Sequence, residues 1–450
     1  METERLVIKF GGVSLKNYKR LKNTAEIIKK NNDKELVVVI SAIGESTNEL
    51  IKSANNALNG NIDYKSIKDI HIIICEKLNV DFLKLKILFN ELEESLLKIK
   101  KSGEIKPKDT DLIMSYGERL SIIVLSEYLN NIGINAKAVN SWELGFITNS
   151  NHLNAEILSE SSEFIKNNLN ELLSKSIVPI VTGFIAKDKL GNITTLGRGG
   201  SDLSASYIAS SINADKVVLW KDVDGILSSN PKLIDKTVKL DEISFREASE
   251  MAFFGAEILH PQSLFPVMGK NISVEIRNFL KHENKGTLIV DKLKENNLNK
   301  IKAISYRRDV TMVQIRSNRM LGNFGFLSKV FKVFNDLEIS VDMIATSEVS
   351  ISLTLDERHD IEKLIERLND FAIIKVSNNN SIVSLIGNTE RSTKIFKQAF
   401  EILHKSEIDV KMVSYGASNV NICFIVKSFE LEKTVNVLHA GLIEREDIIC

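Results

Sequence analysis

The sequence predicts an α/β protein in which an open, mostly parallel β-sheet flanked by helices is followed by two C-terminal α+β modules. In residues 1–291, strand-like and helix-like segments alternate, as they do in sheets that carry helices on both faces. The stretch 291–302 is polar and lacks apolar periodicity, and after it a segment repeats within the chain. At 450 residues the chain is longer than one ordinary domain. We therefore expect three parts: residues 1–291, 303–378 and 379–450.

The first strand is expected at residues 6–10, where an apolar run stops at a pair of glycines. The apolar spacing that follows predicts a helix over residues 16–30. Residues 36–40 form an unalternating apolar run rich in β-branched residues, which is typical of a strand buried on both faces. The further elements expected in this region are helices within 49–101, at 118–130 and at 203–211, and strands at 136–139, 177–182 and 216–220. Ligands of such sheets bind beyond the carboxyl ends of the strands.

The C-terminal part contains an internal repeat. Residues 338–344 resemble residues 407–413, which lie 69 positions further along the chain. Each copy follows an expected helix, at 326–337 and 393–406, and precedes an alternating strand, at 349–355 and 420–426. This order predicts two small α+β modules, which usually pack on each other or on a partner chain.

Composition excludes several classes of protein. Lys and Arg together number 59, as do Asp and Glu, so a zero net charge argues against binding to nucleic acid or to anionic membranes. No apolar run approaches the roughly 18 residues of a membrane span, and no secretory signal opens the chain. Three distant cysteines favour a reducing compartment, which we expect to be the cytoplasm. The seven histidines show no metal-ligand spacing, so no protein metal site is expected.

Two glycine-rich segments at strand–helix junctions are candidate anion sites. Gly11 and Gly12 let the backbone approach an anion, beside a helix N-terminus and the charge of Lys9. A turn that merely requires glycine explains these residues equally well. In the second segment three glycines surround Arg198, whose guanidinium can clasp a carboxylate or a phosphate. Its alternative is a flexible hairpin loop, capped by Ser201 before a helix.

Two further segments are ambiguous when taken alone. Residues 220–232 alternate acidic and basic side chains at the end of an expected strand. This pattern suits the hydroxyl and phosphate groups of a nucleotide, and a solvated loop is just as plausible. Glu118 on its own is best explained as an acidic residue that stabilises the first turn of a helix.

Several motifs occur together along nearly the whole chain: KFGG, SYGERLS, TTLGRGGSD, WKDVDGI, FGAEILHP and, in the repeat, SYGASNVNICF. In this combination the sequence resembles the aspartokinase family. The resemblance implies an amino-acid-kinase domain followed by two ACT modules of the ferredoxin-like type. It also implies phosphorylation of the β-carboxylate of L-aspartate by ATP with Mg²⁺, the first step of lysine, threonine and methionine biosynthesis. No dehydrogenase motif follows, so the chain resembles the monofunctional form.

The resemblance also assigns roles to residues. Lys9 and the amides of Gly11 and Gly12 would hold the transferring phosphoryl group, and Asp202 would order the lysine and the phosphates. The residues implied for aspartate binding are Ser41, Thr47, Glu118 for the α-ammonium group, Arg198 for the α-carboxylate, and Ser201. Those implied for the nucleotide are Lys9, Gly11, Gly12, Ser14, Lys221, Asp222, Leu227 and Lys232. Mg²⁺ would be held mainly by phosphates and water, and the ionised acceptor needs no general base.

Lysine-sensitive relatives suggest an inhibitor site in the ACT modules. One side of it is matched by Met320, Asn323, Gly325, Phe326 and Leu327, and the other by Ser340, Val341, Asp342, Thr346, Ser347 and Glu348. Asp342 and Glu348 could accept an ammonium group, and the helix start at 325–327 suits a carboxylate. The alternative is that these residues only build and cap the modules. The expected assembly is a homodimer through the ACT modules, or a dimer of dimers.

Some positions depart from the family pattern. Val13 replaces a hydroxyl residue, Leu227 an aromatic one and Lys232 an arginine, while Glu257 lies at a variable position. Val13 and Leu227 keep open the alternative of a lysine-sensing protein with a decayed kinase domain. A kinase for another amino acid, such as glutamate or acetylglutamate, is a second alternative, against which the paired ACT modules, Glu118 and Arg198 argue.

Overall fold

The computed structural model describes residues 3–255, 258–293, 301–317, 324–356, 360–389, 392–416 and 419–444. The chain forms two compact units. The first contains Met1–Ile226, Asp241–Phe245 and Ile258–Lys292. The second contains Leu227–Leu240, Arg246–Glu257 and Leu293–Cys450. Within the described ranges, no helix is long and apolar enough to cross a bilayer.

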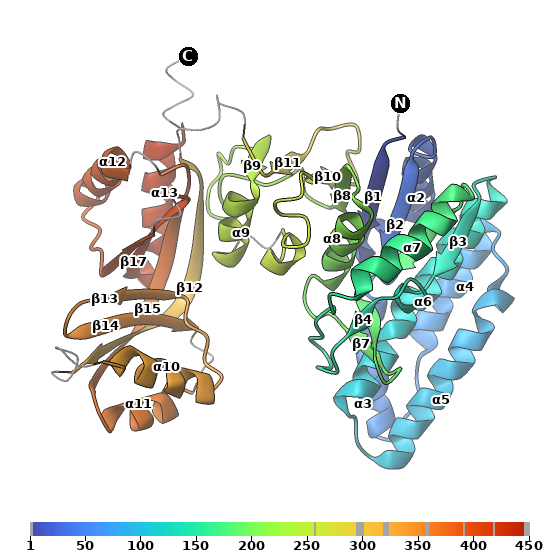
Figure 1. Ribbon diagram of the computed structural model, residues 1–450, viewed down its shortest axis with the longest axis horizontal. Coiled ribbons are helices and arrows are strands. Elements are labelled where there is room, and N and C mark those ends of the chain that lie inside the picture. The colour runs from blue at the N-terminus through green and yellow to red at the C-terminus, as the bar shows by residue number, and fades with distance from the viewer. Residues whose placement is uncertain are drawn as a thin grey trace. The chain divides into compact units, whose positions relative to one another are not determined.

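An eight-stranded sheet forms the centre of the first unit (Figure 1). Its order is β3-β5-β2-β1-β8-β10-β11-β9, and every pairing is parallel except β10–β11. The strands are β1 (Arg5–Phe10), β2 (Glu35–Ile40), β3 (Ala136–Val139), β5 (Val178–Thr182), β8 (Lys216–Lys221), β9 (Glu242–Ser244), β10 (Ser273–Asn278) and β11 (Thr287–Val290). The predicted α/β fold class is thereby confirmed.

Helices cover this sheet. They are α1 (Gly12–Leu15), α2 (Tyr18–Lys30), α3 (Ser46–Leu58), α4 (Lys65–Leu78), α5 (Lys86–Ser102), α6 (Pro107–Asn131), α7 (Ser161–Ser174) and α8 (Gly200–Ile212). Alternate residues of β1, namely Leu6, Ile8 and Phe10, join one apolar cluster with residues of α2 to α6. Helices α7 and α8 pack against β5 and β1, and they lie in front of the strands in Figure 1. A small sheet of β4 (Ile147–Thr148), β6 (Ile185–Asp188) and β7 (Ile193–Thr195) completes the unit.

Two expected helix starts were wrong. The helix expected from residue 118 begins at Pro107, where the Asp109 carboxylate accepts a hydrogen bond from the backbone N–H of Lys106. Proline in the first turn and this cap lie upstream of the apolar pattern, so Glu118 sits inside the helix and not in its first turn. Helix α8 is capped by Gly199 in the left-handed region, so Ser201 lies within the helix and is not its N-cap.

The second unit is built on a six-stranded antiparallel sheet of order β13-β14-β12-β15-β17-β16. Its strands are β12 (Ile301–Arg316), β13 (Met343–Thr346), β14 (Ser350–Asp356), β15 (Ile373–Gly387), β16 (Met412–Tyr415) and β17 (Asn421–Lys427). Its helices are α10 (Phe326–Asp336), α11 (Ile361–Asn369), α12 (Ser392–Lys405) and α13 (Leu431–Leu442). The repeated strand and helix order matches the expected pair of modules.

The long strand β12 serves two apolar cores. Val313 and Ile315, near its end, pack with residues of α10 and α11. Ile301 and Ile304, at its start, pack instead with residues of α12 and α13. The start of β12 therefore contributes to the second repeat, although it precedes the first repeat in the chain.

Two segments that separate strands of the first unit also pack in the second. Ile234 joins the apolar core of the second repeat, and Phe254 packs with residues of β12, β15 and β17. Helix α9 (Phe245–Phe253) carries Glu247, whose carboxylate forms a buried ion pair with Lys302 at 3.0 Å. These contacts tie residues 227–240 and 246–255 to the C-terminal sheet.

Candidate active site

A pocket of about 430 Å³ lies at the carboxyl ends of β1, β2 and β8. Residues from the ends of these strands and from α3, α6 and α8 converge on it. They are Lys9, Gly12, Ser41, Ala42, Gly44, Glu45, Thr47, Asn48, Glu118, Phe184, Gly197, Gly199, Gly200, Ser201, Asp202 and Lys221. The pocket thus lies where ligands of parallel sheets usually bind.

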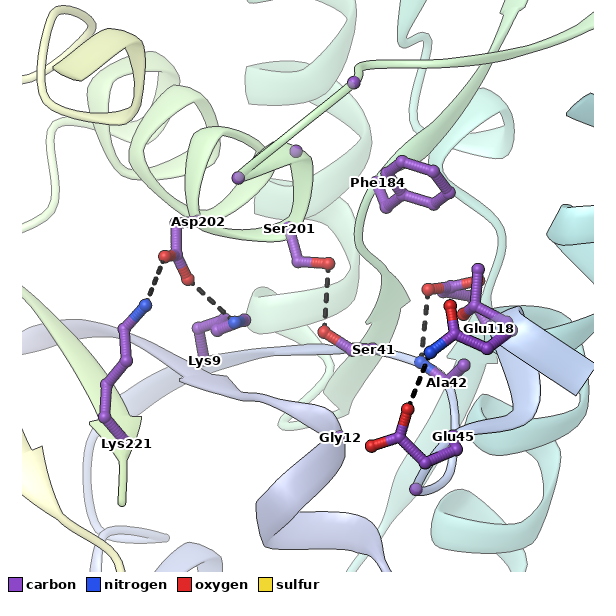
Figure 2. Close-up of a pocket in the computed structure, with 16 residues that line it drawn as sticks. Lys9, Gly12, Ser41, Ala42, Glu45, Glu118, Phe184, Ser201, Asp202 and Lys221 are labelled. Carbon is purple, nitrogen blue, oxygen red and sulfur yellow. Dashed lines mark hydrogen bonds and ion pairs between the residues drawn. The ribbon is translucent and has the colours of Figure 1, made fainter. Parts of the chain in front are cut away.

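One carboxylate between two ammonium groups forms the polar centre of the pocket (Figure 2). The Asp202 carboxylate forms an ion pair with Lys9 Nζ at 2.7 Å and accepts a hydrogen bond from Lys221 Nζ at 2.6 Å. Burial lowers the pKa of Lys9. Burial alone would raise the pKa of Asp202, but the charges of Lys9 and Lys221 outweigh it and hold that pKa well below its usual value. The centre therefore carries two cations and one anion, a net positive charge suited to phosphates.

Glu118 presents a second, different carboxyl group to the pocket. Its Oε1 accepts a hydrogen bond from the Ala42 N–H at 3.1 Å, and among the described residues its Oε2 has no hydrogen-bond partner. Burial raises its pKa to about 8. A cationic group of a ligand would satisfy the second oxygen and favour the ionised carboxylate.

Close backbone approaches shape the walls of the pocket. A Cβ atom on Gly12 would lie 2.7 Å from the carbonyl oxygen of Gly44, so only glycine lets these two loops meet. The Ser41 hydroxyl donates to Ser201 Oγ at 3.0 Å and connects the end of β2 to the start of α8. Thr47, at the start of α3, also lines the pocket.

Arg198 lies outside the lining although its neighbours Gly197 and Gly199 belong to it. Both glycines have positive φ, of 69° and 75°, and the Arg198 side chain between them is exposed. Partial burial and the charge of Arg198 both lower the pKa of His260. A Cβ on Gly199 would lie 2.6 Å from the Cβ of His260, so this turn packs against His260.

The remaining predicted residues of this site lie around the pocket or elsewhere. Gly11, Ser14 and Asp222 belong to the first unit but do not line the pocket. Leu227 and Lys232 belong to the second unit. Sequence reasoning missed the lining residues Ala42, Gly44, Glu45, Asn48 and Phe184. The first four follow β2 directly, so the rule that ligands bind at carboxyl ends of strands could have found them.

Part of the predicted lysine site falls outside the described residues, namely Met320 and Asn323. Gly325, with φ of 81°, caps α10, which begins with Phe326 and Leu327. Phe326 and Val341 pack against one apolar core. The other members lie around β13: Ser340, Asp342, Thr346, Ser347 and Glu348.

Arg307 forms an ion pair with Asp342, the carboxylate that was predicted to accept the ammonium group of lysine. Its guanidinium donates to Asp342 at 2.6 Å and to Asp356 at 2.9 Å.

No group of three His, Cys, Asp or Glu side chains within the described part of the chain could hold a metal ion.

Comparison with known proteins gives a consistent result. Residues 4–278 match the amino acid kinase family, and residues 313–370 and 383–442 match the ACT domain. The chain is 38% identical to Aspartokinase 1, chloroplastic, of Arabidopsis thaliana over 460 residues, which cover 98% of this chain and 81% of that protein. It is 32% identical to Lysine-sensitive aspartokinase 3 of Escherichia coli over 459 residues, covering 98% of this chain and all of the relative.

Solved structures agree with these matches. Escherichia coli aspartokinase III in complex with aspartate and ADP, in its R-state, superposes with a TM-score of 0.84 at 30% identity, covering 98% of this chain and 100% of that one. The complex with lysine and aspartate, in the T-state, gives a TM-score of 0.76 with the same identity and coverage.

Proposed function

This chain belongs to the aspartokinase family, and from that premise we propose that the pocket of the first unit is where the ATP γ-phosphoryl group passes to aspartate. The enzyme is an ATP-dependent aspartate kinase that converts L-aspartate into 4-phospho-L-aspartate. This is the first step of lysine, threonine and methionine biosynthesis, and L-lysine inhibits the enzyme through the ACT modules. The observation that supports this site most strongly is the Lys9–Asp202–Lys221 arrangement beside the buried Glu118.

Phosphoryl transfer depends mainly on positioning and on stabilising charge. Lys9, with the amides of Gly11 and Gly12, would hold the transferring group between the acceptor carboxylate and the leaving phosphate. Asp202 would keep Lys9 and Lys221 in place, since it contacts both ammonium groups. The acceptor is already an anion at neutral pH, so no base has to remove a proton.

The same proposal covers aspartate recognition. Glu118 would accept the α-ammonium group through its unsatisfied oxygen, and Arg198 would clasp the α-carboxylate once its loop turns toward the pocket. Ser41, Thr47 and Ser201 line the same cavity and would orient the substrate. The further nucleotide contacts that we propose in the first unit are Ser14, Lys221 and Asp222.

The residues present fit a Mg²⁺ ion that arrives with ATP. Asp202 is engaged by two lysines, so the ion would be held by phosphate oxygens and water, which suits its reluctance to lose water. Mg²⁺ would supply charge neutralisation on the phosphates. The protein residues that act beside it are Lys9 and Lys221.

We further propose a division into a catalytic domain, residues 1–291, and two ACT modules, residues 303–378 and 379–450. The start of β12 completes the second module. Lysine would bind at the residues given above, from Met320 to Leu327 and from Ser340 to Glu348. We propose a homodimer through these modules and a cytoplasmic location, which suits the free, buried thiols of Cys75 and Cys423.

Replacement of Lys9 tests the site directly. Lys9→Met should lower the rate of aspartyl phosphate formation by at least about a hundredfold, because it removes the cation nearest the transferring charge. Lys19→Met, an exposed position on α2, is the matched control and should keep the wild-type rate. A Lys9 variant with unchanged kcat would refute the proposed role of this pocket.

A further inference from the structure

Asp111 is a fully buried acidic residue that the proposed reaction does not use. Its relative exposure is 0%, and it lies on α6, seven residues before Glu118. Seven residues are about two helical turns, so the two carboxyl groups lie on the same side of the helix. A buried carboxylate is costly unless it is hydrogen-bonded, so its partners indicate what it holds in place.

On one side Asp111 holds the loop that follows β4. Its oxygens accept the Leu153 N–H, at 3.2 Å each, and Oδ2 lies 2.7 Å from His152 Nδ1. Leu153 has a φ of 70°, a left-handed conformation that is uncommon for a residue with a side chain. The carboxylate therefore stabilises a backbone shape that the sequence alone disfavours.

On the other side Asp111 holds the end of β7. Thr195 Oγ1 donates to Asp111 Oδ1 at 2.6 Å, and Thr195 O accepts the Ala155 N–H at 2.9 Å. Asn154 then lies against the next turn, because a Cβ on Gly197 would be 2.6 Å from Asn154 Oδ1. The loop at 152–155 and the end of β7 are thus fixed to one another directly before the segment that carries Arg198.

We propose that Asp111 is a positioning residue for aspartate recognition. It acts on the loop that bears Arg198 through the hydrogen-bonded junction between residues 152–155 and Thr195. Asp111 does not line the pocket. It holds Thr195 and the loop at 152–155 in place. Only the backbone at Gly197 and Gly199 then has to change conformation when Arg198 moves onto the α-carboxylate. This inference rests on the proposed role of Arg198.

The main test is the Asp111→Asn variant of the full chain, assayed with aspartate and ATP varied separately. An amide places a donor where the carboxylate accepts, so the N–H of Leu153 or His152 loses its partner. We expect the KM for aspartate to rise about tenfold, with kcat and the KM for ATP changed less than about twofold. Thr195→Val removes the hydrogen bond between Thr195 and Asp111, and it should likewise raise the KM for aspartate.

β-Alanine, which is aspartate without its α-carboxylate, separates positioning of Arg198 from general damage to the pocket. As a competitive inhibitor it cannot use the arginine, so its inhibition constant should stay within about twofold in Asp111→Asn. A parallel rise of the β-alanine constant and the aspartate KM would overturn the inference. Asp109→Asn is the matched control: Asp109 lies two residues before Asp111 on α6 and accepts the Lys106 N–H, so this variant should leave the aspartate KM within about twofold of wild type.

A double-mutant cycle with Arg198→Ala distinguishes this inference from the proposed function. If Asp111 acts through Arg198, adding Asp111→Asn to Arg198→Ala should change the aspartate KM by less than about twofold. Additive effects, or an unchanged KM in Asp111→Asn beside a raised KM in Arg198→Ala, would overturn the inference alone. If Arg198→Ala itself leaves the aspartate KM unchanged, both the arginine assignment and the inference fall.

Discussion

Among single residues, Glu118 has the property that most directly predicts how activity depends on pH. Burial raises the pKa of its carboxyl group to about 8. An acid with a raised pKa is mostly protonated at neutral pH, whereas an ammonium ligand requires the ionised form. Aspartate binding should therefore release a proton from Glu118 at pH 7.

We expect kcat/KM for aspartate to fall as pH decreases through about 8, by up to about tenfold per unit well below that value. The KM for ATP should change much less over the same range. Steady-state kinetics between pH 6 and 9.5 measure both, and calorimetry in two buffers of different ionisation enthalpy measures the released proton. A flat profile for aspartate would contradict the assigned role of Glu118.

Glu118→Gln is the informative variant for this effect. It should lose the pH dependence together with most of its affinity for aspartate. The unfolded pKa is near the ordinary value and the folded pKa is about 8, so ionisation of Glu118 destabilises the fold as pH rises between the two. Glu118→Gln should consequently unfold at a higher temperature than wild type at pH 8.5, while binding aspartate poorly.

Asp202 supports a prediction about stability. Asp202→Asn would leave the Lys9 and Lys221 ammonium groups facing each other in a buried site, now without the compensating carboxylate. Loss of one partner of a buried charge pair typically costs about 3–5 kcal/mol of unfolding free energy, unless the lysines deprotonate. Urea unfolding measures this loss. Glu283→Gln, which breaks an exposed pair with Lys30, is the control and should change stability by less than about 1 kcal/mol.

At the scale of elements, the contact between α6 and the loop after β2 fixes the geometry of the site. Gly117 of α6 faces this loop, and a Cβ on it would lie 2.7 Å from the Cβ of Ala42. Ala42 donates the backbone hydrogen bond that holds Glu118. One glycine in the middle of a helix therefore sets the distance between two substrate-binding segments.

Gly117→Ala tests this packing, because helix propensity predicts a gain in stability whereas the close contact predicts a loss. Propensity alone would stabilise the helix by about 1 kcal/mol. The close approach should reverse that sign, lower the unfolding temperature and raise the KM for aspartate. Lys108→Ala, at an exposed position of α6, should leave both unchanged. A Gly117→Ala variant that is more stable than wild type and fully active would contradict the packing argument.

Local patterns predicted most elements of the first unit, because buried strands and amphipathic helices have short periods. The strand at 136–139 was predicted with its observed bounds. The C-terminal ends of β1, at Phe10, and of α2, at Lys30, were predicted as well. What periodicity could not predict are contacts between distant segments. Asp111 is one example, because its partners at 152, 153 and 195 belong to loops and a strand end without a pattern of their own.

The candidate site was predicted only in part. Motif resemblance supplied Lys9, Glu118, Asp202 and Lys221, and the structure brings all four to one pocket. It did not supply Glu45 or Asn48, whose side chains hydrogen-bond to each other at 2.7 Å at the pocket wall. The exposure of Arg198 was also unforeseen, since a glycine-rich loop can direct its side chain either way.

At the scale of the whole molecule, the boundary drawn from sequence at residue 291 does not separate the two compact units. Ile234 and Phe254 lie before residue 291 yet are buried with strands and helices of the C-terminal sheet. Glu247 pairs there with Lys302. The kinase part of the sequence thus contributes to the structural core of the regulatory part.

A fragment ending at residue 291 should consequently be unstable. It would expose Ile234 and Phe254, each of which contributes about 1.5–3 kcal/mol when buried, and Glu247 would lose its buried cation. We expect this fragment to bind a hydrophobic dye and to unfold at a much lower temperature than the full chain. Cooperative unfolding at the temperature of the full chain, with normal kinase activity, would contradict this picture.

The most direct measurement of the central claim is ATP-dependent formation of aspartyl phosphate by the full chain, trapped as its hydroxamate, with and without L-lysine. We predict product with aspartate and no product with glutamate. Millimolar lysine should suppress the reaction, as expected for an enzyme with a lysine site in its ACT modules. Absence of product with aspartate, in a folded protein that still binds lysine, would contradict the account and indicate a sensor in place of a kinase.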